Sequence, residues 1–122
     1  MAIILNHTIV PAHDKEVSAQ FFSQLFGLFY EGPEGHFSPV RVNETLTFDF
    51  DNAQSFERHH YAFHVSDQEF DEILQRVRDR GILYGSDPWN LENQQLNDWQ
   101  GGRGFYFRDP DGHLLELMTR AG

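Results

Sequence analysis

The first half of the chain opens with an apolar run at strand period, followed by one at helical period. Residues 3–10 are rich in β-branched side chains and predict a strand, which Pro11 is expected to end. Residues 15–26 place apolar side chains at helical spacing. Asp14 is expected to cap this helix and Gly27 to end it, so the chain begins with a strand and a helix.

The same order of elements returns in the second half. The remaining predicted elements are strands at 28–31, 37–43 and 45–51, a strand at 59–65, a helix at 68–80 capped by Ser66 or Asp67 and ended by Gly81, a strand at 82–85, and two strands within 103–119. Such a repeat indicates a duplicated module. We therefore predict one α+β domain over residues 1–122, built from two βαβββ modules at about residues 1–52 and 58–122.

A single carboxylate interrupts the last predicted strand. The turn Asp-Pro-Asp-Gly at 109–112 precedes it, and His113 beside this turn is expected to be solvated. Glu116 then falls among leucines that occupy both faces of the strand. Burial of an unpaired charge costs several kcal/mol, so Glu116 needs a metal ion, or a buried arginine or histidine without a metal.

Composition narrows the classes of function. The 122 residues include 12 phenylalanines and no cysteine, which is typical of a globular protein of a reducing compartment. The net charge of −10 argues against nucleic acid or an anionic membrane as partner. No apolar run approaches the roughly 20 residues of a membrane span, and no signal peptide is recognised, so a cytoplasmic location is expected.

Two histidines occupy matching positions in the repeat. His7 lies in the opening strand of the first module and His60 in that of the second. Two imidazoles and the Glu116 carboxylate can bind one face of a divalent metal, with Fe(II), Mn(II), Zn(II), Ni(II) and Co(II) all suitable. His64 shares a face with His60. His64 could replace His60 as ligand or act as the catalytic acid or base.

Other side chains are candidates for contact with a substrate. The two strand arginines could anchor an anion or form surface ion pairs. The tryptophans of the irregular stretch 86–102 could cover a planar ligand, or the loop could pack on its own side chains. The predicted substrate-binding residues are Arg41, Asp49, Trp89, Trp99, Arg103 and Tyr106.

Three segments carry a resemblance to a known family: LNHTIVPAHDKEVSAQFFSQLFGL, HHYAFHV and GRGFYFRDPDGHLLELMT. Together they resemble the vicinal oxygen chelate superfamily, which includes glyoxalase I, extradiol dioxygenases, fosfomycin-modifying thiol transferases and bleomycin resistance proteins. The resemblance implies paired βαβββ modules that form a cupped mixed β-sheet with helices outside. It also implies metal ligands at His7, His60 and Glu116, and a homodimer with two sites.

The expected function follows from this resemblance. A metal-dependent lyase, isomerase or dioxygenase would bind vicinal oxygens of a small substrate on the metal. A metal-free sequestering protein of the bleomycin resistance type is the alternative. The stretch NDWQGGRG, before the FYF run, lacks the lysine and serines with which fosfomycin-modifying relatives bind phosphonate, which argues against that activity. The metal, the reaction, and the origin of the ligands from one chain or two stay open at this stage.

Overall fold

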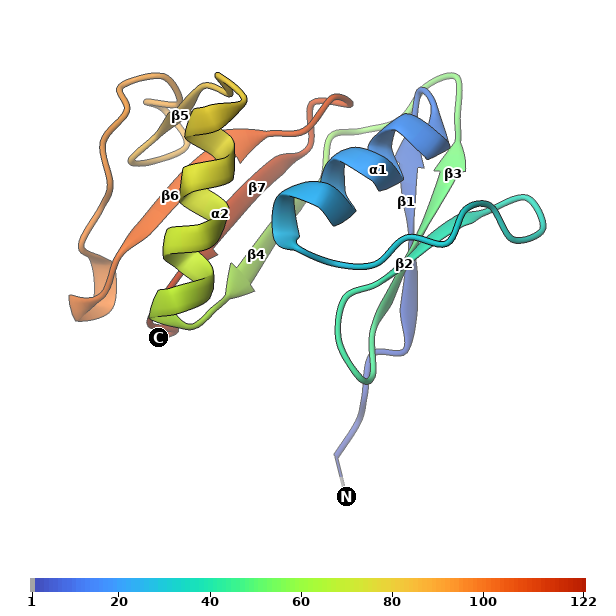
Figure 1. Ribbon diagram of the computed structural model, residues 1–122, viewed down its shortest axis with the longest axis horizontal. Coiled ribbons are helices and arrows are strands. Elements are labelled where there is room, and N and C mark those ends of the chain that lie inside the picture. The colour runs from blue at the N-terminus through green and yellow to red at the C-terminus, as the bar shows by residue number, and fades with distance from the viewer. Residues whose placement is uncertain (1) are drawn as a thin grey trace. The chain divides into compact units, whose positions relative to one another are not determined.

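The computed structural model describes residues 2–122 as two compact units, Met1–Glu57 and Arg58–Gly122 (Figure 1). Each unit contains one α-helix and one small mixed β-sheet. This confirms the predicted α+β class. Among residues 2–122, no helix is long and apolar enough to cross a membrane.

The first unit has a three-stranded sheet in the order β1-β3-β2. It comprises β1 (His7–Ala12), β2 (Ser38–Arg41) and β3 (Thr47–Asn52), with β1 parallel and β2 antiparallel to β3. Helix α1 (Lys15–Phe26) lies against this sheet in Figure 1. The ring of Phe22 on this helix is buried and lies 5.2 Å from that of Phe48 on β3, so the helix and the sheet share an aromatic core.

Local signals set both ends of α1 as predicted. The carboxylate of Asp14 accepts hydrogen bonds from the backbone N–H groups of Glu16 and Val17, two donors that the first turn leaves unpaired. Gly27 ends the helix with φ of 72°, a left-handed conformation that costs glycine little. The helix therefore has the predicted bounds.

Two strand predictions for the first unit are wrong. Pro11 does not end β1, which continues to Ala12 and pairs with β3. A proline is tolerated there because β1 is an edge strand of this sheet, where a missing N–H need not break a ladder. Residues 28–31 form no strand, and Phe29 in this segment is 77% exposed.

The second unit has a four-stranded sheet in the order β4-β7-β6-β5. The strands are β4 (His60–His64), β5 (Tyr84–Gly85), β6 (Gly104–Arg108) and β7 (Leu114–Met118). β4 runs parallel to β7, whereas β6 is antiparallel to both β7 and β5. Helix α2 (Asp67–Asp79) covers one face of this sheet in Figure 1.

Helix α2 begins with a capping box at Ser66, one of the two caps that the sequence allows. The Ser66 hydroxyl accepts the Glu69 N–H, and the Glu69 carboxylate accepts the Ser66 N–H. Its apolar residues are buried as predicted: Phe70, Ile73, Leu74 and Val77. The cap and the apolar stripe thus agree on where this helix starts and which face it buries.

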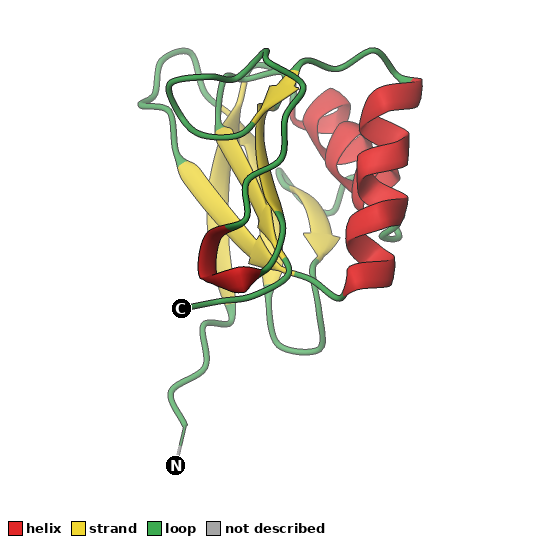
Figure 2. Ribbon diagram, turned by 90° about the vertical axis from the view of Figure 1, so that its left-hand side faces the viewer, coloured by secondary structure: helices red, strands yellow, loops and turns green. Residues whose placement is uncertain are grey.

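The irregular segment between β5 and β6 is held by its own polar side chains. The Asp87 carboxylate accepts the Trp89 N–H, and Asn97 exchanges two backbone hydrogen bonds with Gly104. The segment ends in a short 3₁₀ helix, η1 (Trp99–Gly101), which lies beside the C-terminus (Figure 2). This bonding presents Trp89 to solvent at 86% exposure.

Candidate metal and substrate site

A histidine and a carboxylate meet on one face of the second sheet. The parallel register pairs Ala62 of β4 with Glu116 of β7, which places His60 diagonally across from the carboxylate. The Nε2 atom of His60 lies 3.0 Å from Oε1 of Glu116. Only 12% of the Glu116 side chain is exposed, against 48% for His60. The buried carboxylate predicted from the sequence therefore has a histidine partner.

Tyr106 borders this pair, and Trp99 packs against Tyr106. Tyr106 on β6 lies directly opposite Glu116 in the antiparallel register. Burial, followed by a hydrogen bond with Glu116, raises the pKa of Tyr106, so its hydroxyl keeps its proton at neutral pH. The Tyr106 ring lies 6.0 Å from that of His60 and 5.8 Å from that of Trp99. The Tyr106 ring thus lies between His60 and Trp99.

The spacing of His60 and Glu116 fits a divalent metal. Metal–ligand bonds to histidine nitrogen and carboxylate oxygen are about 2.1 Å long, so two such atoms at a right angle stand about 3.0 Å apart. Nε2 of His60 and Oε1 of Glu116 are 3.0 Å apart. Imidazole and carboxylate donors together suit first-row transition metals. These two residues could hold adjacent positions on such an ion.

The third predicted ligand, His7, lies at the start of β1 in the first unit. Its Nδ1 atom is 2.8 Å from the amide oxygen Oδ1 of Asn6. His7 pairs with Thr47 in the β1–β3 register. Both residues line a cavity of about 350 Å³, together with Asn6 and Asp49. The proposed ligand His7 therefore shares a cavity with Asp49, which was predicted to contact the substrate.

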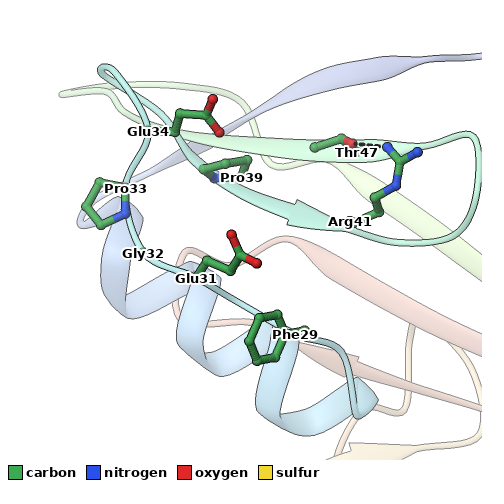
Figure 3. A pocket seen from close by; sticks show the side chains of 8 residues that line it. All are labelled: Phe29, Glu31, Gly32, Pro33, Glu34, Pro39, Arg41 and Thr47. Carbon is green, nitrogen blue, oxygen red and sulfur yellow. Dashed lines mark hydrogen bonds between the residues drawn. The ribbon is translucent and has the colours of Figure 1, made fainter.

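A larger cavity of about 800 Å³ lies between β2 and the segment after α1 (Figure 3). Phe29, Glu31 and Glu34 line it from that segment, and Arg41 and Thr47 line it from the strands. Arg41 donates to Oγ1 of Thr47 at 3.3 Å and to the Glu44 carbonyl at 2.8 Å. Arg41 was predicted as a substrate contact, whereas neither glutamate was: Glu31 falls in the segment predicted as a strand, and Glu34 lies beyond it.

The other predicted site residues lie in the second unit. Nε2–H of His64 donates to the Thr119 carbonyl at 3.1 Å. Arg103 forms ion pairs with Asp71 at 2.7 Å and Asp67 at 3.1 Å, and its guanidinium lies 4.5 Å from the centre of the Phe70 ring. These contacts tie Arg103 to α2. Its predicted role in substrate binding, and the catalytic role of His64, stay predictions.

The expectation that His113 is solvated is wrong. The side chain is fully buried, and its Nδ1 accepts the backbone N–H of His59 at 2.8 Å. The Asp109 carboxylate in turn accepts the N–H groups of Asp111 and His113 at 2.9 and 2.8 Å. The turn between β6 and β7 is thus closed by buried side chains, a role that its sequence did not reveal.

Asp109, Asp111 and His113 also form the one group of three or more potential metal ligands among residues 2–122, with ligand atoms within 4.8 Å of one another. The hydrogen bonds favour a structural role over a metal site. Since Nδ1 of His113 accepts a hydrogen bond, the proton of its neutral ring is on Nε2, and neither nitrogen offers a lone pair without losing a bond or a proton. Metal binding by this cluster would therefore break hydrogen bonds that close the turn.

Substitution of Asp109 by asparagine is expected to stabilise the protein at pH 7 to 8. Burial is the main cause that raises the pKa of Asp109 to about 6. The folded protein therefore binds this proton more tightly than the unfolded chain, and the group's contribution to stability falls as pH rises from about 4 to about 6. Asparagine keeps the acceptor oxygen without the charge, so the free energy of unfolding should rise by about 1–2 kcal/mol.

Urea unfolding of Asp109→Asn and wild type at several pH values measures this effect. Asp98→Asn, at an exposed position with no capping hydrogen bond from its side chain, is the matched control. A variant less stable than wild type at pH 8 would show that the carboxylate charge stabilises the turn.

Comparisons with known proteins match nearly the whole chain. A solved structure, the oxidase ChaP-H2, superimposes with a TM-score of 0.94 at 42% identity, covering 99% of this chain and 96% of that one. Glutathione transferase FosA of Serratia marcescens is 28% identical over 93% of this chain and 78% of its own length. Metallothiol transferase FosB of Lysinibacillus sphaericus is 28% identical over 94% and 81%.

The family assignment rests on nearly the whole chain. Residues 4–117 match the family described as the Glyoxalase/Bleomycin resistance protein/Dioxygenase superfamily. This range includes His7, His60 and Glu116, the three residues that the resemblance named as ligands. The chain belongs to the Glyoxalase/Bleomycin resistance protein/Dioxygenase superfamily.

Proposed function

We propose that this protein is a metal-dependent enzyme of the oxidase or dioxygenase type that acts on a small organic substrate. The observation that carries the proposal is the buried Glu116 carboxylate, held 3.0 Å from Nε2 of His60 at a spacing that suits adjacent metal ligands. The similarity to the oxidase ChaP-H2, at 42% identity over 99% of the chain, supports the oxidative branch of the family.

In this proposal His7, His60 and Glu116 hold a divalent metal, with Fe, Mn, Ni, Zn and Co as candidates. The bound metal would supply Lewis acidity toward vicinal oxygens of the substrate, and with iron an affinity for dioxygen. Because its pKa is raised, the Tyr106 hydroxyl stays protonated and donates a hydrogen bond to Glu116, which restricts the orientation of the carboxylate. Trp99 and Tyr106 would exclude water from one side of the substrate.

Proton transfer is assigned to His64. Its Nε2–H donates to a backbone carbonyl, so Nδ1 carries the lone pair that can accept a proton from a substrate hydroxyl. Its alternation with His60 on β4 places both imidazoles on one face of the strand. Arg41 and Asp49 would contact the substrate from the first unit, where both line cavities.

The protein is proposed to act as a homodimer. His7 belongs to the first unit, whereas His60 and Glu116 belong to the second. The ligand set is complete either within one chain or between the first unit of one copy and the second unit of another. Superfamily resemblance favours the second arrangement.

The acidic character of the larger cavity bears on the substrate. Glu31 and Glu34 line it against one arginine, Arg41, which already bonds Thr47 and Glu44. Two carboxylates disfavour an anion and accept hydrogen bonds from hydroxyl or amino groups. Together with the absence of lysine and serine before the FYF run, this argues against a phosphonate substrate.

One observation favours a second candidate function. Beside its polar groups, the larger cavity has Phe29, Pro33 and Pro39 in its lining and no proposed metal ligand. Such a cavity could sequester a planar molecule without chemistry, as in the bleomycin resistance branch of the family. A sequestering protein would keep its ligand after treatment with a chelator, whereas the proposed enzyme would lose its activity.

Elemental analysis of protein purified without a metal-affinity tag tests the proposed function. About one equivalent of a transition metal per chain is expected, either as purified or after reconstitution with Fe(II), Mn(II), Ni(II) or Zn(II). The identity of the metal that binds most tightly would narrow the reaction. Protein that binds none of these four ions would contradict the enzyme and leave the sequestering function.

A further inference from the structure

We propose that Asn6 is a positioning residue that fixes the ring tautomer of His7. This inference rests on the proposed function, in which His7 is a metal ligand. The amide oxygen Oδ1 of Asn6 lies 2.8 Å from Nδ1 of His7. An amide oxygen only accepts hydrogen bonds, so Nδ1 carries the ring hydrogen. A neutral imidazole has a single ring hydrogen, and Nε2 therefore keeps the lone pair that a metal requires.

A backbone hydrogen bond fixes the position of Asn6. The Asn6 carbonyl accepts the N–H of Thr47 at 2.9 Å, which ties the residue to β3 just before β1 begins. Asn6 and His7 line the same cavity of about 350 Å³, together with Thr47 and Asp49. The hydrogen bond between Asn6 and His7 thus lies in the wall of this cavity.

Other imidazoles of the chain carry the ring hydrogen on Nε2. His64 donates from Nε2 to the Thr119 carbonyl. His113 accepts at Nδ1 from the His59 N–H, which leaves its hydrogen on Nε2. Neither can bind a metal through Nε2 without losing that hydrogen. Nε2 of His60 likewise lies 3.0 Å from Oε1 of Glu116, an acceptor, so His60 would also give up an Nε2 hydrogen to bind a metal through that nitrogen. His7 differs from these histidines because its contact with Asn6 leaves Nε2 unprotonated.

Nitrogen-15 NMR of the metal-free protein at pH 8, where imidazoles are mostly neutral, reads the tautomer directly. In the wild type, Nδ1 of His7 should show the shift of a protonated ring nitrogen and Nε2 that of an unprotonated one. In Asn6→Ala the hydrogen should move largely to Nε2. Titration with Zn(II) alone should show about tenfold weaker binding for Asn6→Ala. Asn6→Asp, which keeps an acceptor oxygen, should restore the tautomer.

Asn43→Ala provides the matched control in the same unit. Asn43 accepts the N–H groups of Thr45 and Leu46 in the β2–β3 hairpin, so its loss removes asparagine hydrogen bonds away from His7. It should lower stability without changing the His7 tautomer. A purely structural Asn6 would behave in the same way as Asn43.

Two results would overturn the inference: a wild-type His7 with its hydrogen on Nε2, or an unchanged tautomer in Asn6→Ala. The proposed function fails separately. If the wild type binds no metal while the tautomer switches as expected, the enzyme assignment is contradicted, and the control of His7 by Asn6 stands.

Discussion

Replacement of Glu116 by glutamine is expected to lower the affinity for a divalent metal by at least about 100-fold. Loss of residues that only orient a ligand costs 10- to 100-fold in affinity, and loss of a ligand with its negative charge should cost more. Glutamine has nearly the same shape and keeps an acceptor oxygen for the Tyr106 hydroxyl and for His60. The change therefore isolates the charge. Calorimetric titration of the metal-free variant with Zn(II) and with Mn(II) measures the loss of affinity.

The metal-free stability of the same variant separates two roles of the carboxylate. Without metal, the free energy of unfolding of Glu116→Gln should stay within about 1 kcal/mol of wild type, since one acceptor oxygen is kept and a buried charge is removed. Glu72→Gln, on the exposed face of α2, is the matched control and should change neither quantity. Unchanged metal affinity together with a large loss of stability would mean that Glu116 acts only as a structural partner of His60.

The helices were predictable because their signals are local. Asp14 and Ser66 bond N–H groups two or three residues away, and Gly27 takes a conformation that other residues adopt only with strain. Such interactions depend little on the rest of the fold. The predicted bounds of α1 agree with the structure, and those of α2 differ by one residue at each end.

The strands were predicted less well because pairing is not local. Residues 28–31 have the composition of a strand, yet this segment leaves α1 without a neighbouring strand to pair with and instead lines a cavity. Pro11 remains within β1 because its strand is at a sheet edge, a fact that depends on the order β1-β3-β2. Propensity alone contains neither piece of information.

The candidate site divides in the same way. Alternation along β7 correctly placed Glu116 against a partner, since side-chain direction in a strand has a fixed period. The buried state of His113 depends on the backbone N–H of a residue 54 positions away, and no local pattern reports such a contact. The role of Asn6 was not predicted, because neighbours in a strand point to opposite faces and the sequence does not show that these two side chains meet.

Truncation of Phe105 to alanine is expected to lower the free energy of unfolding by about 3–5 kcal/mol, the range for a buried phenylalanine. Its side chain has no solvent exposure. Its ring packs edge-on against Phe70 at 5.3 Å and Tyr84 at 5.6 Å, and it stacks on Phe107 at 5.6 Å. A single domain is stable by only about 5–15 kcal/mol, so the loss is a large share of the total. Urea unfolding measures it.

Phe29→Ala is the matched control, because Phe29 is 77% exposed and its truncation should change stability by less than about 0.5 kcal/mol. Equal losses for the two variants would contradict the assigned core. Phe105 and Phe107 occupy one face of β6 with the core, whereas Tyr106 between them faces Glu116. The folded Phe105→Ala variant should therefore still bind metal. The Glu116→Gln variant should keep its stability and bind metal much more weakly. The two faces of β6 thus separate stability from the proposed chemistry.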